Sequence, residues 1–374
     1  MNIKNIGKAA ALALTALAMV HCSDWTEVEN ENIFDHGLTE SNKSEEYYKA
    51  LREWKKTDRS VSFGWYSAWD DPGTATTGML MGVPDSMDII SLWSGAYNLT
   101  PGKIEDLRFV REKKGTKVVV CSFLQYVGKG CTPPEYDTDE DTREAFWGWE
   151  DGNDEAIKAS LAKFAIAIRD SIEKYDYDGL DIDFEPYVDG APGKLDENFT
   201  YFAWLLDELS KYLGPKSGTG RMLIIDGELW NVPKSTATYF DYFVAQAYSV
   251  SGGTPPVGAG TGETNMDSRL SRVISTFAGE LTEEEVTNKF IVTENLESAV
   301  DCQKGGYYWT TRDGVRQDKE VCPSLVGMAR WQPANGFRKG GFGGYRFDGE
   351  SVNTPSYKWM RTAIQAQNPA MNQF

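Results

Sequence analysis

Residues 175–187 read YDYDGLDIDFEPY, and three acidic residues, Asp181, Asp183 and Glu185, stand at alternate positions within them. In a β-strand alternate side chains point to the same side, so the three carboxyl groups would share one face of a strand. The residues between them are apolar and would form the opposite face. Because like charges this close cannot all ionise cheaply, at least one carboxyl group should keep its proton near neutral pH.

This strand belongs to a series of strand-like apolar stretches that alternate with helical patterns, which predicts parallel pairing. Eight strands predict an α/β fold, a closed (β/α)8 TIM barrel with a single catalytic domain. A doubly wound open sheet would need a Gly-rich phosphate turn after its first strand, and Trp65–Pro72 offers none. The expected strands are Val61–Trp69, Met87–Trp93, Lys117–Leu124, Gly179–Pro186, Met222–Glu228, Tyr242–Tyr248, Phe290–Asn295 and Gly341–Phe347. The expected helices are Ser44–Lys56, Lys103–Lys114, Asp154–Tyr175, Asn198–Leu213, Asp267–Ala278, Pro323–Arg330 and Pro355–Gln367.

The acidic residues fall at the end of the fourth expected strand. In barrels of this kind the carboxyl ends of the strands carry the active site, and inward positions are otherwise Val, Ile or Leu. A solvated sheet edge is the competing interpretation, but strands of a parallel barrel are covered on both faces. Two long segments, Gln125–Asp154 and Glu297–Pro323, follow the third and seventh strands and are expected to be binding loops.

The composition argues against several classes of function and of catalytic site. A net charge of −18 argues against nucleic acid, whose phosphates require Lys and Arg. The chain contains two histidines, His21 and His36, and both precede the expected barrel, so a Ser-His-Asp or Cys-His hydrolase and a His-ligated zinc site are disfavoured. Aromatic residues make up 13% of the chain, which suits sugar faces that stack on rings, although core packing uses most of them.

The N-terminus has the pattern of a targeting segment. Lys4 and Lys8 precede the apolar run Ala9–Val20, which is too short to span a bilayer. A cysteine, Cys22, follows and resembles the lipidated residue of a bacterial lipoprotein, although His21 departs from the usual small residue there. We therefore expect a signal peptide over 1–21, an acidic linker and short helix over 22–57 and the catalytic domain over 58–374.

The acidic stretch after the signal resembles the tether of Bacteroidetes surface lipoproteins, and an ordinary disordered linker is the alternative. The expected location is the cell surface or outer membrane of a Gram-negative bacterium, with the lipid as the sole membrane attachment. Export would permit disulfides among the four remaining cysteines. The simplest pairing joins sequence neighbours, Cys121 with Cys131 and Cys302 with Cys322, and four reduced cysteines are the alternative.

At this point the residues resemble a known family. Asp178-Gly-Leu-Asp181-Ile-Asp183-Phe-Glu185 is similar to the DGxDxDxE motif of family 18 glycoside hydrolases. The resemblance implies that Glu185 is the acid/base, that Asp183 orients the substrate acetamide, and that Asp181 supports Asp183 by a shared proton or hydrogen bond. Asp178 would be structural. Two carboxyl groups two residues apart on one strand cannot flank a sugar ring, which suits a mechanism in which the substrate acetamide is the nucleophile.

A second motif refines the substrate. Gln246 and Tyr248 alternate at the end of the sixth strand, and the Gln-x-Tyr form resembles endo-β-N-acetylglucosaminidases that cut the core of N-glycans on glycoproteins. The resemblance implies that Tyr248 donates to the acetamide carbonyl and that Gln246 helps hold it, whereas a buried Gln–Tyr pair is the structural alternative. Further expected sugar contacts are Trp93, Glu228, Trp230, Tyr345 and Arg346.

Three alternatives stay open. The first is a chitinase-like hydrolase of GlcNAc polymers, and the second is a non-catalytic surface lipoprotein that binds glycans. In the third, the three alternating carboxylates would hold Mg²⁺ or Ca²⁺, but hard cations usually gather ligands from several strands. We expect a monomer that uses neither a cofactor nor a metal.

Overall fold

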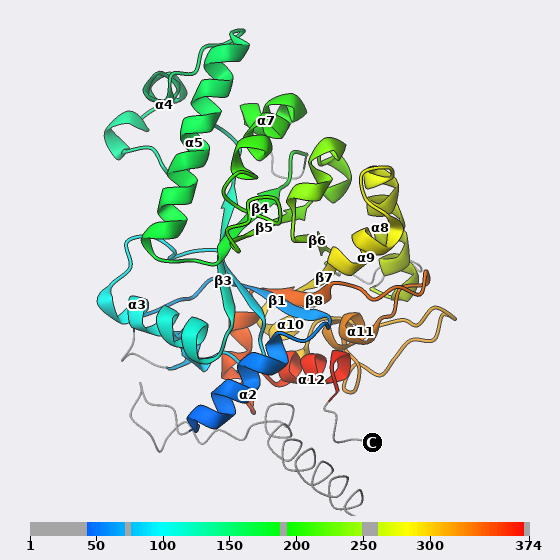
Figure 1. Cartoon of the computed structure of the whole chain (residues 1–374). Coiled ribbons are helices and arrows are strands. Elements are labelled where there is room, and N and C mark those ends of the chain that lie inside the picture. The colour runs from blue at the N-terminus through cyan, green and yellow to red at the C-terminus, as the bar shows by residue number, and fades with distance from the viewer. Residues whose placement is uncertain (1–42, 72–75, 188–192, 249–260, 370–374) are drawn as a thin grey trace, which may run out of the picture.

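The fold is a closed barrel of eight parallel strands, β1 to β8, each paired with its sequence neighbour, and β8 with β1 (Figure 1). The structure is a computed structural model, and it describes residues 43–71, 76–187, 193–248 and 261–369. The prediction of a single (β/α)8 barrel is confirmed. The strands are β1 Val61–Tyr66, β2 Ile89–Leu92, β3 Lys117–Phe123, β4 Gly179–Phe184, β5 Met222–Gly227, β6 Tyr242–Gln246, β7 Phe290–Asn295 and β8 Gly341–Tyr345.

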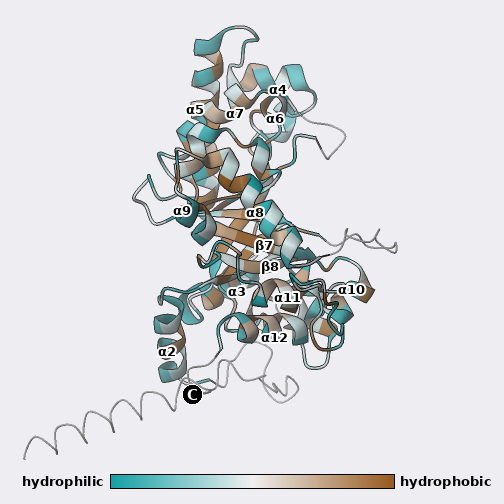
Figure 2. Ribbon diagram, turned by 90° about the vertical axis from the view of Figure 1, so that its right-hand side faces the viewer, coloured by the Kyte–Doolittle hydropathy of each residue, from teal (hydrophilic) through white to brown (hydrophobic). Residues whose placement is uncertain are grey.

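Helices cover the outside of the barrel, and the apolar strands lie between them (Figure 2). None of the helices in the described ranges is long and apolar enough to cross a membrane. Short 3₁₀ turns, Leu229–Asn231 and Lys234–Tyr239, connect β5 to β6 in place of an α-helix. The α-helices are α2 Glu45–Lys55, α3 Pro101–Arg108, α4 Glu140–Trp147, α5 Asp154–Lys174, α6 Lys194–Glu197, α7 Phe199–Leu209, α8 Glu263–Phe277, α9 Glu283–Lys289, α10 Ala299–Lys304, α11 Ser324–Arg330 and α12 Lys358–Gln367.

Helix α5 shows how the sequence pattern sets this outer layer. Asn153 caps its N-terminus by accepting a hydrogen bond from the backbone N–H of Ala156. Its apolar residues recur at helical spacing, and all of those named here are buried against the barrel. These residues are Ile157, Leu161, Phe164, Ile168 and Ile172. The buried stripe therefore packs α5 onto the barrel, directly before the chain enters β4.

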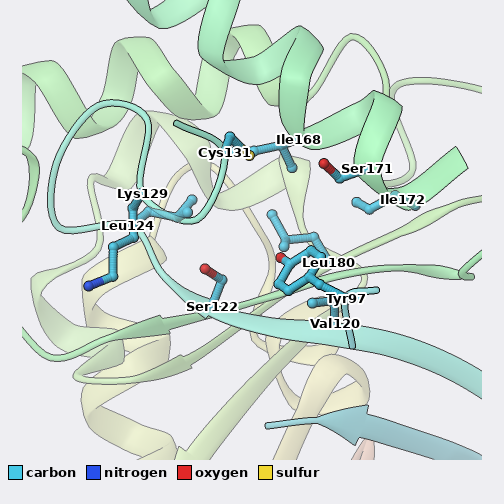
Figure 3. A pocket seen from close by; sticks show the side chains of 10 residues that line it. All are labelled: Tyr97, Val120, Ser122, Leu124, Lys129, Cys131, Ile168, Ser171, Ile172 and Leu180. Carbon is cyan, nitrogen blue, oxygen red and sulfur yellow. The ribbon is translucent and has the colours of Figure 1, made fainter. Parts of the chain in front are cut away.

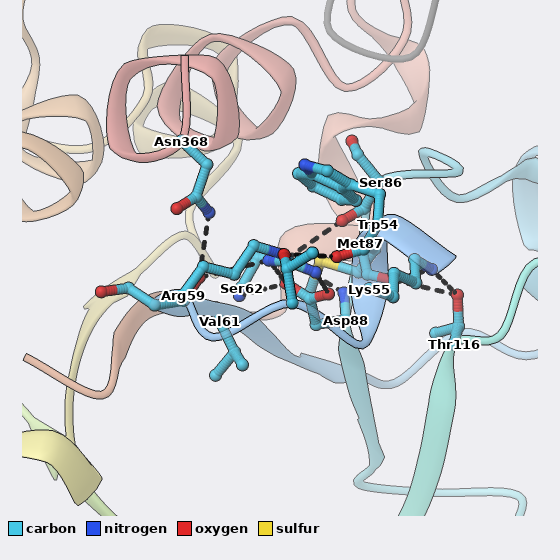
Figure 4. A network of polar contacts seen from close by, with 12 residues as sticks. Trp54, Lys55, Arg59, Val61, Ser62, Ser86, Met87, Asp88, Thr116 and Asn368 are labelled. Atoms are coloured by element: carbon cyan, nitrogen blue, oxygen red, sulfur yellow. Dashed lines mark hydrogen bonds and ion pairs between the residues drawn. The ribbon is translucent and has the colours of Figure 1, made fainter. Parts of the chain in front are cut away.

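A polar network joins α2 to the N-terminal ends of the neighbouring strands (Figure 4). The ammonium of Lys55 donates to the carbonyl of Met87 at 2.6 Å and to the hydroxyl of Thr116 at 2.8 Å. Asp88 accepts from the guanidinium of Arg59 at 2.8 Å and from the backbone N–H of Ser62 at 2.8 Å. Helix α2 is thereby held next to the N-terminal ends of β2 and β3. The carboxyl ends of the strands lie at the opposite end of the barrel.

The disulfide prediction is wrong, because the structure holds Cys121, Cys131, Cys302 and Cys322 as free thiols. Cys121 packs among the side chains inside the barrel. Cys131 instead lines a small void between the outer face of β3 and α5, so the two sulfur atoms lie on opposite sides of the sheet (Figure 3). That void measures about 10 Å³, enough for about one water molecule and too small for a ligand.

Candidate active site

The alternation of β4 places the acidic motif as the sequence predicts. All six residues of the strand, Asp181 and Asp183 among them, are buried, and Glu185 follows at the mouth, where it is half-buried. Asp178 stands at the opposite end. Its carboxylate pairs with Arg111 at 2.7 Å and Lys117 at 3.0 Å, so it anchors the start of the strand.

Gly227 at the end of β5 allows the mouth to close around Glu185. Its φ is +92°, in the region that favours glycine, and an added Cβ would lie 2.5 Å from the carbonyl oxygen of Phe184 and 3.1 Å from Cγ of Glu185. Any side chain at this position would therefore push against the strand end that carries Glu185.

Asp181 lies at the floor of the site and is fully buried. One of its oxygens accepts a hydrogen bond from the indole N–H of Trp65 at 3.0 Å and another from the hydroxyl of Ser91 at 2.6 Å. Burial raises the pKa of Asp181 to about 6, although these two hydrogen bonds favour the ionised form. Trp65 and Ser91 were not singled out from the sequence, although both occupy inward positions of expected strands.

A fourth acidic residue, Asp226 on β5, completes the cluster. It is paired in register with Asp183 and is fully buried. The amide of Gln246 donates to Asp226 at 2.8 Å and to Asp183 at 3.3 Å, so three strands meet in one hydrogen-bonded group. Asp226 was not predicted from the sequence, although its place two residues before Glu228 in an otherwise apolar strand was an available signal.

The cluster holds protons at neutral pH. Burial, followed by the charges of Glu185 and Asp181, raises the pKa of Asp183 to about 8. Burial and the neighbouring Asp183 raise the pKa of Asp226 well above its usual range. Asp226 in its acid form can therefore donate a hydrogen bond to its carboxylate neighbours. The support of Asp183 by a proton shared with Asp181 stays a prediction.

Aromatic residues wall the mouth next to these acids. The ring of Tyr345 on β8 lies 6.0 Å from that of Tyr248, nearly parallel, and 5.9 Å from that of Trp93. Burial, followed by the nearby acidic groups, raises the pKa of Tyr248 well above its usual range. The phenol therefore stays protonated and can donate a hydrogen bond. The structure thus brings Trp93, Tyr248 and Tyr345 together beside Asp183.

The remaining expected sugar contacts are placed differently. Glu228 is buried just after the end of β5 and accepts a hydrogen bond from the amide of Asn231. Arg346 stands at the rim, 3.4 Å from Glu297 of the loop after β7. The ring of Trp230 lies under the guanidinium of Arg272 on α8, at 4.0 Å, in the outer layer rather than among the acids.

One group within the described ranges has metal-ligand spacing, formed by Cys121, Asp181 and Asp226. Its donor set includes a thiol, which Mg²⁺ and Ca²⁺ do not favour, and Asp181 already accepts from Trp65 and Ser91. This arrangement fits a proton-sharing cluster better than a site for a hard cation.

Comparison with known proteins agrees with this geometry. Residues 26–366 match the family model described as glycoside hydrolase family 18, BT1044-like. The chain belongs to glycoside hydrolase family 18. Its acidic motif therefore sits in a family 18 barrel, at the strand end where the sequence resemblance placed it.

Individual family 18 relatives cover most of the chain. It is 27% identical over 342 residues to endo-β-N-acetylglucosaminidase F2 of Elizabethkingia meningoseptica, covering 85% of each chain. The structure of a BT1044 variant aligns with a TM-score of 0.72 and 26% identity, covering 89% of this chain and 98% of that one. An endo-β-N-acetylglucosaminidase from Cordyceps militaris shares the fold at a TM-score of 0.58 and 18% identity, covering 89% and 99%.

Proposed function

We propose that this glycoside hydrolase is an endo-β-N-acetylglucosaminidase that cleaves the GlcNAc-β1,4-GlcNAc core of N-glycans with retention of configuration. The observation that carries the proposal is the group formed by Glu185, Asp183, Gln246 and Tyr248 at one end of the barrel. The likeness to endo-β-N-acetylglucosaminidase F2 over 85% of the chain supports the substrate class.

The chemistry follows from the positions of the acids. Glu185 is at the mouth and donates a proton to the leaving oxygen, while the 2-acetamido carbonyl of the substrate attacks the anomeric carbon. Asp183 accepts a hydrogen bond from the acetamide N–H and stabilises the cyclic oxazolinium ion that forms. Glu185, now ionised, takes a proton from water, which attacks the anomeric carbon and opens the ring. Two displacements at one carbon retain its configuration.

Gln246 and Tyr248 would hold the acetamide in place for that attack. The Tyr248 phenol is kept protonated and can donate to the carbonyl oxygen. The side-chain amide of Gln246 donates its protons to Asp183 and Asp226. Its role would therefore be to orient Asp183, and not to donate a hydrogen bond to the sugar. An acetamide held by a donor on one side and a carboxyl on the other is preorganised as a nucleophile.

Incubation with a defined glycoprotein, followed by mass spectrometry of both products, tests the proposal. We expect a free glycan ending in one GlcNAc and a protein that keeps one GlcNAc per site. Chitotetraose at equal concentration is the control. It has the same linkage but lacks the branched part of the glycan, so it should be cleaved more slowly. Equal or faster cleavage of chitotetraose would favour the chitinase-like alternative.

We also propose that the protein is exported and lipid-anchored through Cys22, as the N-terminal sequence predicts. Residues 1–42 lie outside the described residues, so the support is the sequence alone. Replacing Cys22 by Ala in the full chain should move the protein from the membrane fraction to the soluble fraction of the cells that produce it. An unchanged membrane fraction would contradict the anchor without affecting the proposed activity.

A further inference from the structure

A recess lies where the chain enters α5 and α7. It is a hollow of about 470 Å³ lined by Asp151, Lys194, Asn198, Phe199, Thr200 and Tyr201. These residues come from the end of the long β3–α5 segment and from α6 and α7, which follow β4 in sequence. Helices α4, α6 and α7 lie close together in the same part of the molecule (Figure 2).

The hollow is connected to the catalytic strand through aromatic rings. The ring of Phe199 lies 6.1 Å from that of Phe184 and 6.3 Å from that of Tyr187. Phe184 directly precedes Glu185 and Tyr187 follows it by two residues, and the side chain of Tyr187 is 72% exposed. Phe184 lies on the outer face of β4, where it stacks on Phe202. The hollow therefore adjoins the rim of the candidate active site through Phe199 and Tyr187.

The lining combines an aromatic wall with polar groups. The ring of Tyr201 is half-buried and lies edge-on against Trp149 at 5.4 Å, which fixes its orientation. Trp149 in turn donates from its indole N–H to Asp151 at 2.9 Å. A ring held in place beside carboxylate, hydroxyl and amide groups matches a sugar, which presents an apolar face and a rim of hydroxyl groups.

The charged side chains of the hollow favour neutral sugars over anionic ones. The ammonium of Lys194 lies 2.8 Å from Glu144, 3.1 Å from Asp151 and 3.3 Å from Glu140. Three carboxylates thus surround one ammonium, and the local charge is negative. An anionic sugar would meet net repulsion there, and Lys194 is already engaged, whereas a neutral sugar can donate its hydroxyl protons to the carboxylates.

We propose that this hollow binds a neutral hexose on an arm of the glycan whose core is cleaved at Glu185, and that it disfavours arms capped with an acidic sugar. The inference rests on the proposed function and adds to it a substrate preference. The hexose could be mannose of a high-mannose glycan or galactose of a complex glycan, since both present the same hydroxyl chemistry.

The experiment compares kcat/KM on four asparagine-linked glycans: the trimannosyl core alone, a high-mannose glycan, a biantennary glycan ending in galactose, and the same glycan capped with sialic acid. Tyr201→Ala should lower kcat/KM about fivefold on the neutral long-arm glycan that the wild type prefers, through KM, and leave the core unchanged. Tyr201→Phe keeps the ring and should behave as wild type. Asp151→Asn should raise kcat/KM on the sialylated glycan about twofold relative to the neutral one.

Tyr212→Ala is the matched control. Tyr212 follows the C-terminal end of α7, where its ring packs under Arg169 at 4.8 Å, so its loss should not distinguish the four glycans. Equal losses on the core and the long arms in Tyr201→Ala, or no loss on any glycan, would overturn the inference. So would a wild type that prefers the sialylated glycan.

A wild type that cleaves none of the four glycans contradicts the proposed function. Calorimetric binding of the two neutral long-arm glycans to the Glu185→Gln protein, with and without Tyr201→Ala, then decides the role of the hollow separately. We expect Kd to rise about fivefold when the ring is removed. An unchanged Kd, or no binding at all, would refute the hollow as a sugar site.

Discussion

Asp183 and Asp226 face each other across the β4–β5 pair, in register, and a single amide group, that of Gln246, donates to both. Burial raises the pKa of both carboxyl groups, and the charges of Glu185 and Asp181 add to it for Asp183, as those of Asp183 and Asp181 do for Asp226. The pair therefore keeps at least one proton through the neutral range, and Asp183 can act as a hydrogen-bonding partner of the substrate without a second full negative charge beside it.

This pairing predicts that Asp226→Asn changes the pH dependence of stability. A carboxyl group whose folded pKa is raised binds more protons in the folded than in the unfolded chain, so stability falls as pH rises from about 4 towards 8. The variant lacks one such group, and its free energy of unfolding should exceed that of the wild type by about 1–2 kcal/mol at pH 8, and by less at pH 5. Urea unfolding at both pH values measures this, and a difference that shrinks with rising pH would be incompatible with a protonated Asp226.

Glu185→Gln should abolish turnover while glycan binding survives. The amide keeps the size and shape of the carboxyl group but has no proton to transfer, so kcat should fall by at least about 10²-fold. Steady-state hydrolysis gives kcat, and calorimetry gives Kd for the uncleaved glycan. Turnover within about threefold of the wild type would rule out the acid/base role of Glu185.

A GlcNAc-thiazoline analogue of the core should inhibit competitively. The fused ring copies the oxazolinium ion, and a mimic of a high-energy intermediate binds at least about 10²-fold more tightly than the substrate. The ratio of Ki to KM measures the effect, and proton NMR of the first product reports its anomeric configuration. An enzyme that ignores the analogue, or that inverts the anomeric carbon, does not use the substrate acetamide.

Lys339→Met should destabilise the barrel. The Lys339 side chain is 1% exposed, and its nitrogen donates to the carbonyl of Ala329 at 2.8 Å and to that of Trp331 at 2.7 Å, at the end of α11. Burial lowers its pKa to about 7, so at pH 8.5 the loss reflects two hydrogen bonds more than a charge. We expect a loss of about 2 kcal/mol in the free energy of unfolding.

The control for this prediction is Lys211→Met, at an exposed lysine paired with Glu208 on the surface. Its effect should stay within about 0.5 kcal/mol. If both variants unfold at the same urea concentration, the capping of α11 by Lys339 contributes nothing measurable.

The sequence predicted the barrel because apolar strand-like stretches alternate regularly with segments of helical periodicity, and the apolar stripe of α5 is buried as expected. It predicted the position of Asp183 and Glu185 because alternation along one strand is a local property. Asp226 was missed because its significance depends on which residue of the neighbouring strand it faces, and that register is set by the closure of the whole barrel.

Two other outcomes have the same cause. The pairing of Cys121 with Cys131 seemed simple along the chain, yet the two sulfurs lie on opposite faces of β3. Trp230 lies three residues after the end of β5, but the 3₁₀ turn that contains it carries the ring outward to Arg272. A residue that follows the end of a strand can lie on either side of the sheet, and closeness in sequence does not determine which.

Helix α2 gives the molecule a direction. It contacts the N-terminal ends of β2 and β3 through Lys55, whereas Glu185 lies at the carboxyl end of β4. The anchor proposed at Cys22 precedes α2 in sequence, so an anchored chain would join the barrel at the end opposite Glu185. Under that proposal, a glycoprotein substrate would approach the enzyme from the side away from the point where the chain joins the barrel.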